Sequence, residues 1–180
     1  MFPVKRAAAS SATLLGLALT LGTAGACGYQ PVHGGQAPAD RLSVVAAPAL
    51  VPDAEAQQAA LAGARSELGR EGVLGSPTGY PRLVVELVRV DAEAVGIAEL
   101  DGRPIGRGAK VSVVARGWVE DAAGAPPSRV TGDVRRALTS PEGDGAISAA
   151  ALRRDAARRA GEAAGRAVAR HVLGIPTARE

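Results

Sequence analysis

The first 27 residues constrain this chain most, because they have the pattern of a segment that is removed before the protein folds. Basic residues at 5–6 precede an apolar run over 7–21, and small residues at 24–26 lead to Cys27. The apolar run is shorter than the roughly 20 residues that a membrane-spanning helix requires. We therefore predict a signal peptide over residues 1–26 and a mature chain that begins at Cys27.

Cys27 is the only cysteine of the chain, so it has no partner for an intramolecular disulfide. The segment around it resembles a bacterial lipoprotein signal, in which the new N-terminal cysteine carries a diacylglycerol thioether and an amide-linked acyl chain. An ordinary signal peptidase cutting at the same bond is the alternative, since Ala24 stands where such signals most often have leucine. Two or more acyl chains anchor a protein stably. We predict lipid attachment at Cys27 and, because Gly28 rather than aspartate follows it, a place on the periplasmic side of the outer membrane.

Removal of the signal leaves a nearly neutral chain. Of 21 basic and 18 acidic residues, two basic ones lie in the signal, so the net charge falls from +3 to +1. No run of basic residues interleaved with aromatic ones remains, which argues against nucleic acid as a partner. Residues 28–40 are rich in glycine and proline and predict a flexible tether. Residues 41–176 are long enough for a single domain, which leaves a short tail over 177–180.

Hydrophobic spacing predicts two helices and four strands in this domain. Apolar and polar side chains alternate over residues 110–120, as in a strand that has one buried face. The predicted order is β-α-β-β-β-α, which favours an α+β two-layer sandwich: a four-stranded mixed sheet with two helices on one face. We expect residues 91–109 to be a long connection. The predicted strands are Leu42–Ala47, Arg82–Val90, Lys110–Glu120 and Arg129–Leu138, and the predicted helices span about 53–71 and 146–173.

The sequence offers little chemistry for catalysis or metal binding. The two histidines, His33 and His171, lie in the tether and near the end of the last helix, and neither has a second ligand at local spacing. We therefore predict no catalytic residue, no metal site and no cofactor, and hence a protein that is not an enzyme. The basic, glycine-rich loop 102–108 lacks the spacing of a nucleotide-binding loop, so we interpret it as a strand connection.

Glycines within the predicted elements indicate close packing. Gly161 and Gly165 form a G-x-x-x-G on the last helix, whose arginines exclude a membrane span. We predict that these two glycines let the helix approach the sheet closely. We also predict that Gly117 points from its strand toward the same helix surface.

One face of the predicted sheet is a candidate binding surface. If Leu83, Val85 and Leu87 face the helices, the side chains between them point away, joined by others from the neighbouring strands. Valines, a tryptophan and arginines on one face are typical of a site for a partner or for an amphiphile that bears phosphates. A register shifted by one residue would instead place this face partly in the core. The candidate contact residues are Arg116, Trp118, Arg129 and Arg135, with Val84, Glu86, Val88, Val90 and Val114 beside them.

The chain resembles the LPS-assembly lipoprotein (LptE) family. The resemblance is carried by Cys27–Pro31 after the signal, by the stretches 80–87 and 114–119, by the order of elements, and by the alanine- and arginine-rich last helix. It implies an outer-membrane lipoprotein lodged in the lumen of the LptD β-barrel, which assists assembly of that barrel and binds lipopolysaccharide. Only the acylated cysteine, Cys27, is carried over as a site residue. An auxiliary lipoprotein of a lipid-transporting ABC system and an unrelated secreted enzyme are the alternatives.

Overall fold

The computed structural model describes residues 41–48, 51–96, 99–104, 107–141 and 143–176. The predicted signal peptide, the tether with Cys27 and the tail at 177–180 lie outside the described residues. In chain order the elements are β1 (Ser43–Ala46), α2 (Ala54–Arg70), β2 (Arg82–Gly96), β3 (Glu99–Leu100), β4 (Arg103–Pro104), β5 (Arg107–Glu120), β6 (Val134–Pro141) and α3 (Ala146–Val172).

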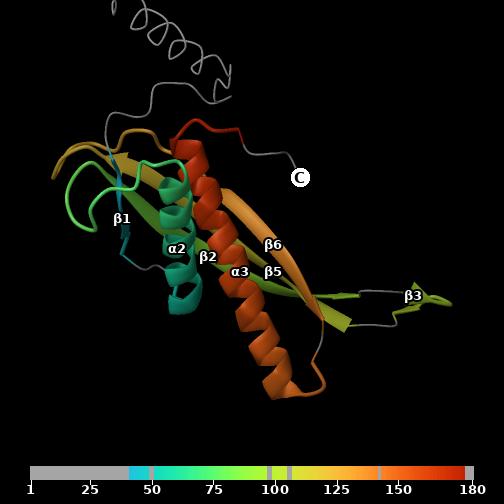
Figure 1. Cartoon of the computed structure of the whole chain (residues 1–180). Coiled ribbons are helices and arrows are strands. Elements are labelled where there is room, and N and C mark those ends of the chain that lie inside the picture. Colours follow the sequence, from blue (N-terminus) through green and yellow to red (C-terminus); the bar gives the residue numbers. More distant parts are fainter. Residues whose placement is uncertain (1–40, 49–50, 97–98, 105–106, 142, 177–180) are drawn as a thin grey trace, which may run out of the picture. The chain divides into compact units, whose positions relative to one another are not determined.

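Four of these strands form one mixed sheet in the order β1-β2-β5-β6. β1 and β2 are parallel, and the other neighbours are antiparallel. Both helices pack on the same face of this sheet (Figure 1). The predicted α+β fold with the order β-α-β-β-β-α is therefore confirmed, with β3 and β4 added as a separate two-stranded ladder between β2 and β5.

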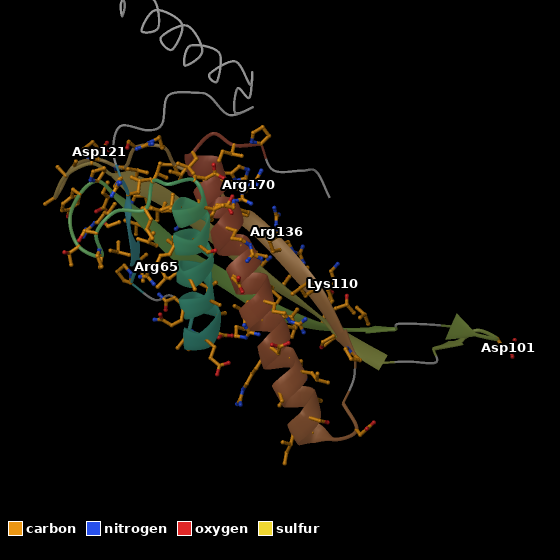
Figure 2. The ribbon with its side chains drawn as sticks, viewed as in Figure 1. Arg65, Asp101, Lys110, Asp121, Arg136 and Arg170 are labelled. Atoms are coloured by element: carbon orange, nitrogen blue, oxygen red, sulfur yellow. The ribbon has the colours of Figure 1, made fainter. Side chains whose placement is uncertain are left out.

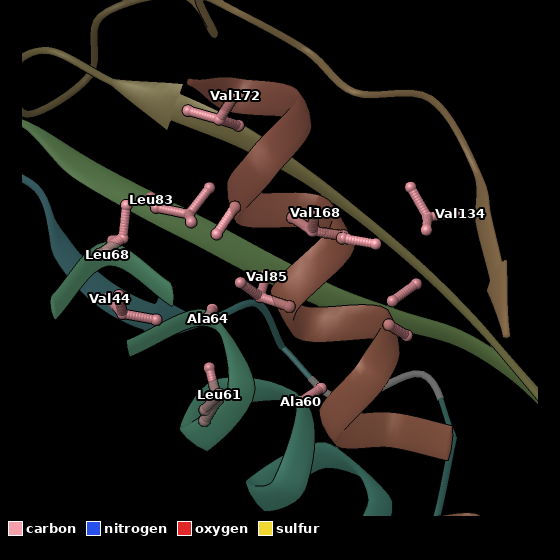
Figure 3. Packing of buried hydrophobic residues seen from close by; sticks show 14 of the residues in the cluster. Val44, Ala60, Leu61, Ala64, Leu68, Leu83, Val85, Val134, Val168 and Val172 are labelled. Atoms are coloured by element: carbon pink, nitrogen blue, oxygen red, sulfur yellow. The ribbon is translucent and has the colours of Figure 1, made fainter. Parts of the chain in front are cut away.

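The helix-facing side of the sheet builds the hydrophobic core. Alternate residues of β2 and β5, among them Leu83, Val85 and Val113, are almost completely buried there. They meet Ala64 of α2 and Val168 of α3, and Figure 3 shows how these small and branched side chains interdigitate. Each fully buried valine or leucine stabilises the fold by roughly 1.5 to 3 kcal/mol relative to an exposed one.

A β-bulge in β2 changes the face to which its later residues point. Leu87 pairs with Ala115, but the next pair joins Arg89 to Val114, which leaves Val88 as an extra residue on the β2 side. Because of this shift, Val90 lies opposite Val113 and packs against the core. The prediction that Val90 points away from the helices is therefore wrong.

The predicted long connection over residues 91–109 is also wrong. The β2–β5 ladder continues without a break from the pair Asp91–Ser112 to the pair Gly96–Arg107, so most of this stretch is a long hairpin. Asp101 lies at its far end (Figure 2). The hairpin extends the sheet well past the part that α2 covers.

The last strand begins five residues later than predicted, at Val134. Before it, Ser128 exchanges two backbone hydrogen bonds with Val119 of β5 and Thr131 donates one to Gly117, but Arg129 and Gly132 have φ angles of +46° and +67°. Left-handed residues interrupt an extended strand. Arg129 is therefore an exposed loop residue and does not lie in β6.

The glycines of α3 face α2 and not the sheet, contrary to the prediction. A Cβ at Gly161 would lie 2.6 Å from the carbonyl oxygen of Ala56, and one at Gly165 would lie 1.9 Å from that of Ala60. Gly63 of α2 is equally close to the backbone of α3. From Gly161 and Ala56, through Gly165 and Ala60, to the ion pair of Arg170 with Glu67, the contacts advance in the same direction along both helices, so α2 and α3 run parallel. At the glycines the two backbones are too close to leave room for a Cβ.

Gly117 lies on the helix-facing side of β5, as predicted. A Cβ there would lie 2.5 Å from Cγ1 of Val168 and 3.0 Å from the carbonyl oxygen of Val84. We expect Gly117→Leu to lower the free energy of unfolding by roughly 1 to 3 kcal/mol through overpacking. Chemical denaturation measures this change, and an unaltered midpoint would show that the core has room at this position.

Candidate functional site

The candidate site is the outer face of the sheet, meaning the side away from α2 and α3. Cross-strand pairing sets which residues share it: Val84 lies opposite Trp118, Glu86 opposite Arg116, and Val114 opposite Arg135. Their neighbours along each strand point into the core. Three of the four sequence-predicted contact residues, Arg116, Trp118 and Arg135, are thus brought to one face, whereas Arg129 lies in the loop before β6.

The floor of the outer face is already buried, although both helices pack on the opposite side. Val84 and Val114 are 4% and 7% exposed, and Glu86 and Ser112 are equally hidden. Two arginines of the same face reach the polar residues of this floor, since Arg116 bonds to Glu86 and Arg135 to Ser112. Val84 and Val114 of this face are therefore not open to solvent. What the face presents is chiefly arginine and the partly buried Trp118.

Glu86 and Arg116 form the central ion pair of this face. Nε of Arg116 donates to Oε2 of Glu86 at 2.7 Å and a terminal nitrogen donates to Oε1 at 3.2 Å, so the pair is bidentate. The Glu86 side chain is 7% exposed, whereas that of Arg116 is 45% exposed. This hydrogen bond and the charge of Glu86 raise the pKa of Arg116 above its ordinary value. The charge of Arg116 is thus largely committed to one buried carboxylate.

A second network holds Trp118 at the end of the sheet. Its indole Nε1 donates to Oε1 of Glu120 at 3.2 Å, and Nε of Arg82 donates to Oε2 of the same carboxylate at 2.8 Å. The Arg82 guanidinium also lies 4.6 Å from the ring centre of Tyr80, a cation–π arrangement. The hydrogen bond from Arg82, and then that from Trp118, hold the pKa of Glu120 below its ordinary value.

The lowered pKa of Glu120 predicts an acid-sensitive contribution to stability. Because the unfolded chain takes up this proton more readily than the folded one, the contribution is complete above the ordinary glutamate pKa and is lost as pH falls through the lowered one. We expect Glu120→Gln to flatten the acid limb of the stability curve. Urea midpoints measured from neutral pH downward test this. Parallel loss of stability in the wild type and the variant would contradict it.

Arg135 differs from the other arginines of the outer face. A terminal nitrogen donates to the hydroxyl of the buried Ser112 at 3.2 Å, and within the described part of the chain Arg135 makes no ion pair. Its side chain is exposed. Of the predicted contact residues on this face, Arg135 is therefore the arginine whose charge is not neutralised by a carboxylate.

A polar cluster that the sequence reading did not single out joins the two helices. Glu67 of α2 is 3% exposed and accepts a hydrogen bond from Arg70 at 2.5 Å and one from Arg170 of α3 at 3.5 Å. Arg170, labelled in Figure 2, also donates to the carbonyl of Pro176 at 2.8 Å. The sequence does indicate that Glu67 is buried, since it falls on the same helical face as the apolar residues Ala60, Ala64 and Leu68. The cluster ties the chain after α3 to α2.

Among the described residues, the other sequence-predicted candidates do not form a catalytic or metal-binding site. His171 is exposed in the last turn of α3, and His33 lies outside the described residues. In the described ranges no group of three or more potential ligands could hold a metal ion. No helix in those ranges is long and apolar enough to cross a membrane. Within the loop 102–108, the side chains of Arg103 and Arg107 are not among the described ones.

Comparisons with known proteins found similarity only among solved structures. No protein-family model matches the chain, and no curated protein matches it. A Caulobacter crescentus CB15 protein described as a lipoprotein is 19% identical over 74% of this chain and 88% of its own, with a TM-score of 0.47. A minor lipoprotein from Acinetobacter baumannii is 13% identical, with 77% and 98% covered and a TM-score of 0.44. Rare lipoprotein B from Shewanella oneidensis is 13% identical, with 75% and 92% covered and a TM-score of 0.37. At these identities and TM-scores the similarity assigns neither a family nor a function.

Proposed function

We propose that this chain is an outer-membrane lipoprotein of the LptE type, anchored on the periplasmic side by acyl chains on Cys27. In this proposal it works by binding and not by catalysis: it assists assembly of an LptD-like β-barrel and binds lipopolysaccharide. The lipoprotein-type signal that ends at Cys27 supports the anchor. The two-layer fold supports a binding role because both helices pack on one side of the sheet and neither covers the outer face.

The observation that carries the binding role is the composition of the outer face. Arg135 is exposed without an acidic partner among the described residues, and Trp118 shares its face. Arginine binds phosphate through paired N–H groups, and tryptophan and arginine are the residue types that most often dominate interfaces. We assign Arg116 a structural role. Because Arg116 is already paired with Glu86, it stabilises the sheet beneath the contact residues and does not itself contact the ligand.

The test begins with a pull-down of the full chain from gently solubilised outer membrane. We expect the wild-type chain to bring down a β-barrel and to retain lipopolysaccharide. Trp118→Ala combined with Arg135→Gln is expected to weaken one or both interactions. Because the indole also donates to Glu120, its loss lowers the melting temperature somewhat, so binding is compared at a temperature where both proteins are folded. Arg166→Gln is the matched control, because it removes a half-exposed arginine of α3 from its ion pair with Glu162 on the opposite side of the sheet.

Each alternative has its own outcome in the same experiment. Recovery of an inner-membrane ATPase complex in place of a barrel would indicate the auxiliary lipoprotein of an ABC system. Wild-type binding by the double variant would exclude the outer face. Mass spectrometry of the N-terminal peptide tests the anchor separately, since an unmodified thiol at Cys27, or normal membrane fractionation of Cys27→Ser, would refute it.

A further inference from the structure

The first half of α3 projects past the end of α2. Ala56 lies against Gly161 and Ala60 against Gly165, so the start of α2 at Ala54 falls near residue 159 of α3. Residues 146–159, here called the arm, therefore have no helix beside them and rest on the hairpin of β2 and β5 and on β6 (Figure 1). At 1.5 Å per residue the arm is about 21 Å long.

The arm carries a concentrated positive charge. Arg153, Arg154, Arg158 and Arg159 stand within seven residues, and the one acid among them is Asp155. Asp155 accepts from Arg158 at 2.7 Å and also pairs with Arg159, so one carboxylate is shared by two guanidinium groups. Arg153 and Arg154 make no ion pair within the described ranges. The acids that face the arm from elsewhere are Glu55 of α2 and Glu162, which act on Arg158, and Glu93 of β2, which lines a small pocket together with Arg153.

The outward stripe of the arm combines this charge with an apolar tip. Ile147, Ala151, Arg154 and Arg158 follow one another at helical spacing, and all four are exposed. Ile147 is 89% exposed, the highest value among the large hydrophobic side chains of the described part of the chain. The helix begins at Gly145 with no side-chain cap and has no acid in its first turn, and Asp144, just before it, is the described acid nearest to the partial positive charge of its N-terminus.

We propose that the arm docks on the anionic phospholipid headgroups of the bilayer that holds the Cys27 acyl chains, with Arg154 and Arg158 on the phosphates and Ile147 at the acyl boundary. This inference rests on the lipid anchor of the proposed function. An arginine-bearing stripe with an apolar residue at one end is what interfacial helices present to membranes. A tether of residues 28–40 can span at most about 45 Å, so an anchored domain stays within reach of the headgroups. The exposed Ile147 and this proximity favour a bilayer over an acidic protein.

The test uses the full chain reconstituted into vesicles, with an environment-sensitive dye on Ile147→Cys. We expect blue-shifted emission on vesicles that contain phosphatidylglycerol and little change on pure phosphatidylcholine. Arg154→Gln combined with Arg158→Gln should weaken this response by tenfold or more, since each arginine near an anionic surface contributes on the order of 1 kcal/mol. Arg41→Gln combined with Arg89→Gln, which removes two exposed arginines outside the arm, should leave it unchanged.

Several outcomes would overturn the proposal. No shift on anionic vesicles excludes docking, and an equal shift on both vesicle types shows insertion without charge recognition. Loss of the shift in inorganic phosphate, compared with chloride at equal ionic strength, would mean that the arm binds free phosphate. Response to an acidic protein but not to vesicles would indicate that class of partner instead. Dye uptake by the wild-type chain would reveal a free Cys27, so failure of the anchor is detected apart from failure of the arm.

Discussion

Replacing Gly165 by alanine is expected to lower the free energy of unfolding by about 3 kcal/mol or more, although the same change inside an unencumbered helix stabilises by about 1 kcal/mol. The added Cβ would lie 1.9 Å from the carbonyl oxygen of Ala60, and 2.7 and 2.9 Å from the carbonyl carbon and Cα of that residue. All three are backbone atoms of α2, so no rotamer change can relieve the clash. The two helices would have to separate and lose contacts on both sides.

Gly69 of α2 provides the matched control. It is an exposed helical glycine, and a Cβ there would meet only Cδ2 of Leu74, at 3.9 Å. We expect Gly69→Ala to raise stability by roughly 0.5 to 1 kcal/mol because it restricts the unfolded chain. Urea denaturation of both variants gives the comparison. If the two alanines changed stability in the same direction, close backbone contact between α2 and α3 would not be what requires glycine at residue 165.

The glycine pattern shows how far sequence periodicity can lead. Spacing of four residues defines a face of α3, and the close approach at Gly161 and Gly165 was predicted correctly. The element that they approach was predicted wrongly, because helical spacing does not reveal which element covers a helix face. Gly63 of α2 could have indicated the second helix, since a second helical glycine between small residues is typical of two helices in backbone contact.

The strands show the same limit in another form. Period-two alternation predicted the helix-facing side of β2 and β5 and put Arg116, Trp118 and Arg135 on the outer face. It did not predict the bulge at Val88, which depends on the pairing of two strands and reverses the direction of Val90. Residues 91–96 include aspartate, glutamate and alanine, which are weak strand formers. Their extended conformation comes from the ladder with β5, a tertiary effect.

Removing the side chain of Arg116 is expected to destabilise the fold far more than removing a surface arginine. In Arg116→Ala the carboxylate of Glu86 loses both of its hydrogen bonds from the guanidinium. Leaving a largely buried carboxylate without its partner costs more than losing an exposed ion pair. Arg89→Ala is the control, because Arg89 pairs with Asp91, whose side chain is 44% exposed, and such pairs contribute about 0 to 1 kcal/mol.

A second substitution separates charge from packing at this site. Adding Glu86→Gln to Arg116→Ala removes the buried charge, so we expect it to recover most of the lost stability, as measured by denaturant midpoints. No recovery would mean that packing of the aliphatic part of Arg116, and not its charge, accounts for the loss. The same ion pair limits how binding at the outer face can be tested. A charge-reversed variant, Arg116→Glu, would place a second carboxylate beside Glu86 and disturb the fold. Loss of binding in that variant would therefore say nothing about contacts. Arg135 makes no ion pair among the described residues, so its replacement, checked by a melting curve because it also bonds to Ser112, reports better on ligand binding.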